Sequence, residues 1–339
     1  MTDTMRAFVM TRYGGPNVAE LRTMPRPVAG PGEVLVRVHA AALNPVDFKT
    51  REGKLKVIQR YDLPVVMGNE LAGVVEAVGA GVTGFTTGDR VFARTPKGAM
   101  GAFAEYAAVP ASVLAHAPAS IDLPTAAAIP LAALTALQAL RDELHLQPGT
   151  KVFIPGGAGG VGTFAIQIAK HLGAHVTTTA SPRGRDLVER LGADAVVDYT
   201  SQRIADHVRD MDGAFDLIGG DTLDASFAVV KPGGAVVSVA ALPEPLTATK
   251  DLGRGPTLAA LFWLASFGLR AKAHRHGVAY RFLFMHPSGL ELAELGALVD
   301  QGKLEPIIDR VVPFENIADA FTHLESGRAK GKIVVRMVG

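Results

Sequence analysis

The sequence predicts an α/β protein in which a β-rich domain is joined to a doubly wound parallel sheet. Short apolar runs separated by Gly and Pro fill the first third of the chain. From Lys151 onward, patterns typical of strands and of helices alternate, and a glycine-rich turn joins the first of these strands to the first helix. Such alternation with short links favours a parallel sheet covered by helices on both faces. The 339 residues, 48% of them hydrophobic, suffice for two domains.

The first domain is expected to be a compact, barrel-like β domain over residues 1–124. Its strands are expected at 34–40, 71–78, 90–93 and 103–109, with turn-forming Gly and Pro between them. Near the other end, 290–300 and 317–324 predict amphipathic helices and 332–337 a closing strand. We therefore expect residues 275–339 to complete the first domain.

The second domain is expected over residues 125–274, as a Rossmann-like block inserted into the first. Residues 125–140 predict a helix kinked at Pro130. Strands are then expected at 151–155, 175–180, 195–197, 214–218 and 235–240, with helices at 160–172, 185–191 and 204–209 between them. Near residues 250–274 lies an apolar insert whose role the sequence leaves open between a partner surface and an ordinary covering helix.

Composition excludes several classes of function. A formal net charge of +1 argues against a general nucleic-acid binder. The absence of cysteine excludes disulfides, thiolate catalysis and cysteine-ligated metals. The apolar stretch at 256–269 is shorter than the about 20 residues of a membrane span. With no signal-peptide pattern at the N-terminus, a cytoplasmic location is expected.

The glycine-rich turn predicts a dinucleotide site. Glycines at 157, 159 and 162 fit the spacing G-x-G-x-x-G, which allows a tight turn and a close approach of the backbone to a pyrophosphate. The following helix would point unpaired N–H groups at that anion. The predicted cofactor-binding residues of this turn are Gly157, Ala158, Gly159, Gly160, Val161 and Gly162.

The end of the second strand of this block favours NADP over NAD. An NAD site usually has an acidic residue about 20 residues after the turn, yet none lies between Lys170 and Asp186. Ser181, Arg183 and Arg185 lie there instead and suit a 2′-phosphate. The alternative is that both arginines only face solvent on a loop.

At these residues the sequence resembles the quinone oxidoreductase branch of the medium-chain dehydrogenase/reductase family. The resemblance covers essentially the whole chain, with matching motifs at 41–47, 71–75, 88–91, 156–162, 191–194 and 327–335. Residues 275–287 and the insert before them are most similar to the reticulon-interacting oxidoreductase subgroup. The resemblance implies a GroES-like catalytic domain, a Rossmann domain, a cleft between them, NADPH as reductant and homodimers joined through the Rossmann sheets. It also implies that Thr135 contacts the nicotinamide and Tyr199 the adenosine end.

The same resemblance also implies a reaction without a metal ion. Zinc-dependent relatives carry Cys near Asn44 and Gly-His-Glu near Gly68, where this chain has Gly68, Asn69 and Glu70. Hydride transfer to an already electrophilic quinone or α,β-unsaturated carbonyl does not require a Lewis acid. Asn44, Asp47 and Lys49 are the predicted catalytic residues, since Lys49 follows the Asp where many relatives have Tyr.

Two alternatives stay open at this point. Asn44 and Asp47 could serve only to fix their loop through side-chain to backbone bonds. The whole protein could be an NADPH-binding interaction or chaperone-like protein with little turnover, because fold alone does not determine function.

Overall fold

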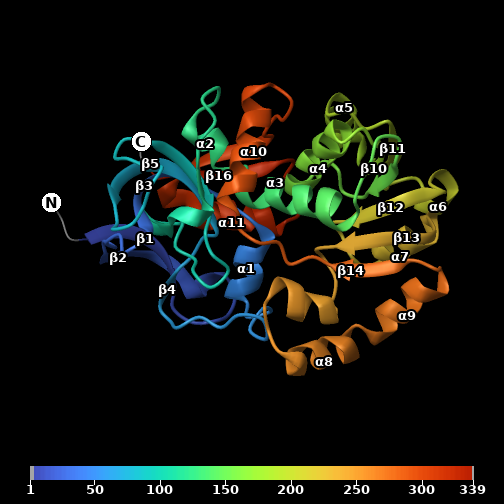
Figure 1. Ribbon diagram of the computed structural model, residues 1–339, viewed down its shortest axis with the longest axis horizontal. Helices are drawn as coiled ribbons and strands as arrows, with labels where there is room; N and C mark the ends of the chain where they lie inside the picture. Colours follow the sequence, from blue (N-terminus) through green and yellow to red (C-terminus); the bar gives the residue numbers. More distant parts are fainter. Residues whose placement is uncertain (1–3, 338–339) are drawn as a thin grey trace. The chain divides into compact units, whose positions relative to one another are not determined.

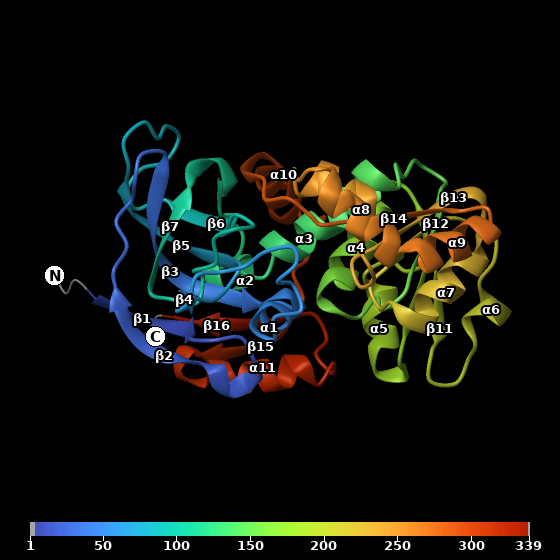
Figure 2. The same ribbon diagram turned by 90° about the horizontal axis from the view of Figure 1, so that it is seen from below.

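The computed structural model describes residues 4–337, which form two compact units. Unit 1 comprises Met1–Leu134 and Pro287–Gly339, and unit 2 comprises Thr135–His286. Figures 1 and 2 show the chain leaving the first unit and returning to it after the second. The two divisions fall at 134/135 and 286/287, later than the predicted 124/125 and 274/275.

Unit 1 is built on two sheets. A seven-stranded sheet has the order β15-β16-β3-β5-β6-β8, with β7 also paired to β3, and all its pairs except β15–β16 are antiparallel. A three-stranded antiparallel sheet has the order β2-β1-β4. The strands are β1 (Thr4–Met10), β2 (Ala19–Pro25), β3 (Glu33–Leu43), β4 (Val65–Val66), β5 (Glu70–Val78), β6 (Arg90–Arg94), β7 (Tyr106–Pro110), β8 (Leu114–His116), β15 (Ile308–Pro313) and β16 (Lys332–Arg336).

The core of unit 1 joins both ends of the chain. The ring of Phe321 on α11 lies 5.8 Å from that of Phe8 and 5.9 Å from that of Phe103. Because residues more than 200 positions apart share this core, the C-terminal segment is an integral part of the unit. Its helical segments are η1 (Pro16–Val18), α1 (Pro45–Arg51), η2 (Ala111–Val113), α2 (Leu123–Ala126), α10 (Gly289–Asp300), η5 (Phe314–Asn316) and α11 (Ile317–Glu325).

Unit 2 is a six-stranded, fully parallel sheet of the order β11-β10-β9-β12-β13-β14. The strands are β9 (Lys151–Ile154), β10 (His175–Ala180), β11 (Ala195–Asp198), β12 (Met211–Asp216), β13 (Val230–Ser238) and β14 (Ala279–Phe282). The order reverses between β9 and β12, and ligands of doubly wound sheets bind beyond the carboxyl ends of the strands at such a point.

Helices cover both faces of this sheet, with α4 and α5 on one face and α7 and α9 on the other (Figure 1). The helical segments are α4 (Gly160–His171), α5 (Pro182–Arg190), α6 (Ile204–His207), α7 (Gly220–Val229), η4 (Thr247–Asp251), α8 (Pro256–Ala265) and α9 (Phe267–Arg275). The helix α3 (Pro130–Leu137) and the π-helical turn η3 (Gln138–Glu143) precede them, and α3 straddles the division between the units.

Three local features differ from the prediction. The helix expected at 125–140 is interrupted, because α2 ends at Ala126 and Pro130, which lacks a backbone N–H, begins α3. The apolar stretch at 256–269 forms two helices, which meet at Ser266. Residues 275–286 do not belong to the first domain, since β14 pairs in parallel with β13 and extends the sheet of unit 2.

Candidate active site

The glycine-rich turn of unit 2 connects β9 to α4. A Cβ at Gly157 would lie 2.2 Å from the Thr178 hydroxyl, and one at Gly162 would lie 2.3 Å from the carbonyl oxygen of Gly156. Both positions therefore require glycine for the turn to close this tightly. The helix α4 begins without a side-chain cap and without an acidic residue in its first turn. Its first N–H groups and its dipole thus suit an anion such as a pyrophosphate.

The end of β10 is held beside this turn. The backbone N–H of Gly156 donates to the Thr179 hydroxyl (2.9 Å), and that of Gly157 donates to the Thr179 carbonyl (3.2 Å). A Cβ at Gly184 in α5 would lie 3.1 Å from the Ala158 side chain. The turn and the start of α5 are therefore neighbours, as a single dinucleotide site requires.

The predicted 2′-phosphate residues lie around the start of α5. Ser181 is its N-cap residue, and Arg183 is exposed in its first turn. Arg185 pairs with Glu189 (3.1 Å) and donates to the Val196 carbonyl (3.3 Å), so its guanidinium already has partners. Tyr199, just after β11, is 60% exposed. Thr135, the predicted nicotinamide contact, is buried on α3.

Unit 1 contains a buried polar cluster at the start of α1. The backbone N–H of Asn44, the N-cap residue, donates to one carboxylate oxygen of Asp47 (2.7 Å), and the Asn69 amide donates to the other (2.6 Å). Asp47 is fully buried. Burial raises the pKa of Asp47 to about 7, although the bonds from Asn69 and Asn44 act in the opposite direction.

The ammonium of Lys332 lies at the centre of the same cluster. Its Nζ donates to Glu70 Oε1 (2.8 Å), to the Leu43 carbonyl (3.0 Å) and to Asn44 Oδ1. Asn44 Nδ2 also donates to Glu70 Oε1 (2.6 Å), and the backbone N–H of Leu131 donates to Glu70 Oε2 (2.6 Å). The Lys332 and Glu70 side chains are 3% and 0% exposed, so this ion pair is satisfied by hydrogen bonds in a nearly water-free site.

These hydrogen bonds distinguish Asn44 and Asp47, which are bonded within the cluster, from Lys49, the third predicted catalytic residue. The Asn44 amide donates to Glu70 and to the Ala42 carbonyl (3.3 Å), and both Asp47 oxygens already accept N–H groups. This geometry favours the alternative in which Asn44 and Asp47 hold the loop. Within residues 4–337, the Lys49 ammonium makes no hydrogen bond or ion pair. Partial burial lowers the pKa of Lys49, and the Lys54 charge lowers it further.

Glu70, Asn69 and Lys332 were not among the predicted site residues. The signal was available, because Glu70 begins a buried apolar strand and Lys332 begins another, and a charge in such a place requires a partner. Their pairing could not be derived from the sequence, since 262 positions separate them.

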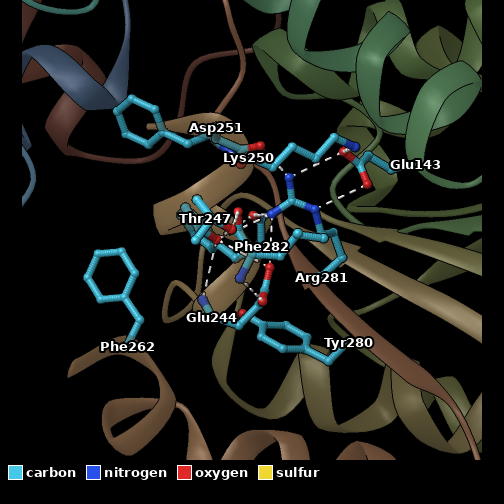
Figure 3. Close-up of polar contacts among 12 residues, drawn as sticks. Glu143, Glu244, Thr247, Lys250, Asp251, Phe262, Tyr280, Arg281 and Phe282 are labelled. Carbon is cyan, nitrogen blue, oxygen red and sulfur yellow. Dashed lines mark hydrogen bonds and ion pairs between the residues drawn. The ribbon is translucent and has the colours of Figure 1, made fainter. Parts of the chain in front are cut away.

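A second buried ionic cluster lies in unit 2 and was also not predicted (Figure 3). Arg281 of β14 bonds Glu143 of η3 (3.1 Å), Glu244 (2.9 Å) and Asp251. Asp251 accepts from the backbone N–H of Phe284 (2.9 Å). This cluster fixes η4, and with it the start of the insert, to the edge strand of the sheet.

Among the residues described here, no three His, Asp or Glu side chains gather as a set of metal ligands. No helix in that part of the chain is long and apolar enough to cross a membrane.

Comparison with known proteins gives two family matches. Residues 30–119 match the family described as "Alcohol dehydrogenase GroES-like domain", and residues 191–335 match the family described as "Zinc-binding dehydrogenase". A solved quinone oxidoreductase from Coxiella burnetii is 31% identical with a TM-score of 0.84, covering 99% of this chain and 100% of its own.

Two curated relatives are similar over nearly the whole chain. The mitochondrial NAD(P)H oxidoreductase RTN4IP1 of Danio rerio is 35% identical over 98% of this chain and 92% of its own length. The chloroplastic NADPH-dependent alkenal/one oxidoreductase of Arabidopsis thaliana is 36% identical over 98% of this chain and 79% of its own length.

Proposed function

Because the chain belongs to the quinone oxidoreductase branch of the medium-chain dehydrogenase/reductase family, we propose that it is an NADPH-dependent reductase of quinones or α,β-unsaturated carbonyls. In this reaction a hydride adds to the electrophilic carbon of an α,β-unsaturated carbonyl or to a quinone. A proton from the surroundings then completes the reduction. The observation that carries the proposal is the turn at the start of α4, where Gly157 and Gly162 leave no room for a Cβ, next to a strand end that has no acidic residue.

NADPH is the proposed reductant for an electrostatic reason. The start of α5 presents Ser181 and the exposed Arg183, and no Asp or Glu lies from 171 to 185 to accept from a ribose 2′-hydroxyl or to repel a 2′-phosphate. Arg183 is the stronger candidate for the 2′-phosphate, because it lies exposed in the first turn of α5, two residues after the N-cap residue Ser181. When bound, NADPH would supply the hydride, and residues 157–162 would hold its pyrophosphate.

Lys49 is the proposed donor to the acceptor oxygen. Reduction builds negative charge on that oxygen, and an ammonium not committed to another group can stabilise it. Asn44, Asp47 and Lys332 are proposed to position α1, on which Lys49 lies. We propose that no metal takes part, because the Asn44 amide, at the place of a zinc-binding Cys, is bonded to Glu70 and Lys332.

A turnover screen tests the proposal. Purified protein with NADPH would be offered alkenals, enones and quinones, and with NADP simple alcohols. Conjugated acceptors should oxidise NADPH, and alcohols should not reduce NADP. Tight NADPH binding without turnover on any acceptor would favour the interaction or chaperone-like alternative. Chelators should not change turnover, and loss of activity on chelation would contradict a metal-free reaction.

Assembly and location are proposed separately. Among the described residues, β14 has a hydrogen-bonded strand on one side only, so a second copy could extend the sheet there. We propose a homodimer, which sedimentation would distinguish from a monomer. A cytoplasmic location stays a prediction, and the two curated relatives named above are mitochondrial and chloroplastic.

A further inference from the structure

The helix α8 presents an apolar surface that the described residues leave uncovered. It contains no charged residue, yet only Phe262 of its ten residues is buried. Four large side chains of α8 and the start of α9 are about half exposed or more: Leu261 (49%), Trp263 (49%), Leu264 (69%) and Phe267 (55%). The rings of Trp263 and Phe267 lie 5.6 Å apart, so they form one continuous surface. We call these four residues the apolar patch.

In the segment that carries the apolar patch, all the charged side chains are basic. Residues 252–278 contain no Asp or Glu, but they contain Arg254, Arg270, Lys272 and Arg275. The Arg270 guanidinium lies over the Trp263 ring, 5.4 Å from its centroid. Lys272 pairs with Asp224, whereas Arg275 is exposed at the end of α9. Large apolar side chains in a segment whose charged residues are all basic are complementary to an apolar layer with an anionic surface.

The patch is held at a fixed place in unit 2. The Arg281 cluster fixes η4, which precedes α8, to β14 (Figure 3). Within the insert, the Ser266 hydroxyl donates to the Phe262 carbonyl (2.7 Å) and accepts from Arg270 (3.1 Å). The joint between α8 and α9 is thus bonded on both sides, and the apolar side chains lie on an ordered surface.

We propose that this patch docks the protein on an anionic lipid bilayer, with α8 lying in the plane of the interface. Ten residues of helix cannot cross a bilayer, but they can insert one face at the depth of the headgroups. A second copy of the chain is the less favoured occupant. A two-fold contact would place the apolar patches of the two copies against each other. It would also bring their two basic segments together, and the like charges would repel.

The test is binding of the 339-residue chain to sedimented vesicles. Trp263 is the chain's only tryptophan, so its fluorescence reports on the patch directly. Vesicles containing phosphatidylglycerol should bind the protein and shift Trp263 emission to shorter wavelength. Vesicles of phosphatidylcholine alone should bind it about tenfold less tightly or worse, and added salt should weaken binding.

Two variants and one control sharpen the result. Leu264→Asp and Arg275→Glu should each weaken binding by about tenfold or more, without lowering the melting temperature. Leu290→Asp, at a leucine 88% exposed in unit 1, should bind like the unaltered protein. No binding to anionic vesicles, or equal binding by all variants, would overturn the proposal. Conversion of a dimer to a monomer by Leu264→Asp in the absence of lipid would assign the patch to a second copy instead.

Discussion

Replacing Lys332 with Met tests whether the buried cluster at α1 organises unit 1. The change removes the positive partner of Glu70, which then keeps, among the described residues, Asn44 Nδ2 and the Leu131 N–H as its donors. It also leaves the Leu43 carbonyl and Asn44 Oδ1 without the ammonium. Removing one partner of a buried ion pair costs about 3–5 kcal/mol, so the free energy of unfolding of unit 1 should fall by that amount.

Urea unfolding followed by circular dichroism measures this loss, and two further variants interpret it. Lys303→Met removes an exposed lysine of the same unit and should change the free energy of unfolding by less than about 0.5 kcal/mol. Adding Glu70→Gln to Lys332→Met removes the uncompensated charge and should recover about 1–2 kcal/mol. A loss below about 1 kcal/mol for Lys332→Met would refute the argument, since a buried carboxylate would then tolerate the absence of its cation.

Three further predictions concern the two sites. Lys49→Met should lower kcat about 100-fold with little change in NADPH affinity if its ammonium stabilises the developing oxyanion, and an unchanged kcat in steady-state assays would exclude it. Arg183→Ala should weaken NADPH binding about tenfold or more and NADH binding little, and equal weakening in titrations would show that Arg183 only faces solvent. The pKa of Asp47 is raised to about 7 in the folded state, so its proton stabilises the fold at low pH. That stability should decline by about 2–3 kcal/mol from pH 5 to pH 8, and Asp47→Asn should flatten the decline in pH-dependent unfolding; a parallel decline in both proteins would assign it to other groups.

The glycine-rich turn of the candidate cofactor site followed from the sequence because its determinants are local. A strand, a glycine-rich turn and a helix lie within 21 residues, from Lys151 to His171. The spacing of the glycines alone indicates where backbone segments approach too closely for a side chain. The order of the strands from β9 to β13 followed for the same reason, since hydrophobic periodicity is set residue by residue, whereas α7 and β14 of unit 2 were not predicted. The missing acidic residue after β10 is likewise readable from the chain itself.

The boundaries of unit 2 needed the tertiary structure. The strand β14 is four residues long, and its place in the sheet depends on pairing with β13 across more than 40 positions. The hydrophobic periodicity of so short a strand is too weak to predict such a pairing. The division of residues 125–140 at Pro130 was misjudged as a kink, because a proline suits the first turn of a new helix as well as a bend in an old one.

The buried clusters were decided by the tertiary structure alone. The sequence determined that Glu70 and Lys332 each begin an apolar strand, and that Arg281 follows a basic segment. Only the sheet of unit 1 brings Lys332 of β16 to the end of β3, where Asn44 and Glu70 meet its ammonium. Only the edge of the other sheet brings Arg281 to three acids. Local patterns fix which elements form, whereas the partner of a buried charge depends on which distant strands become neighbours.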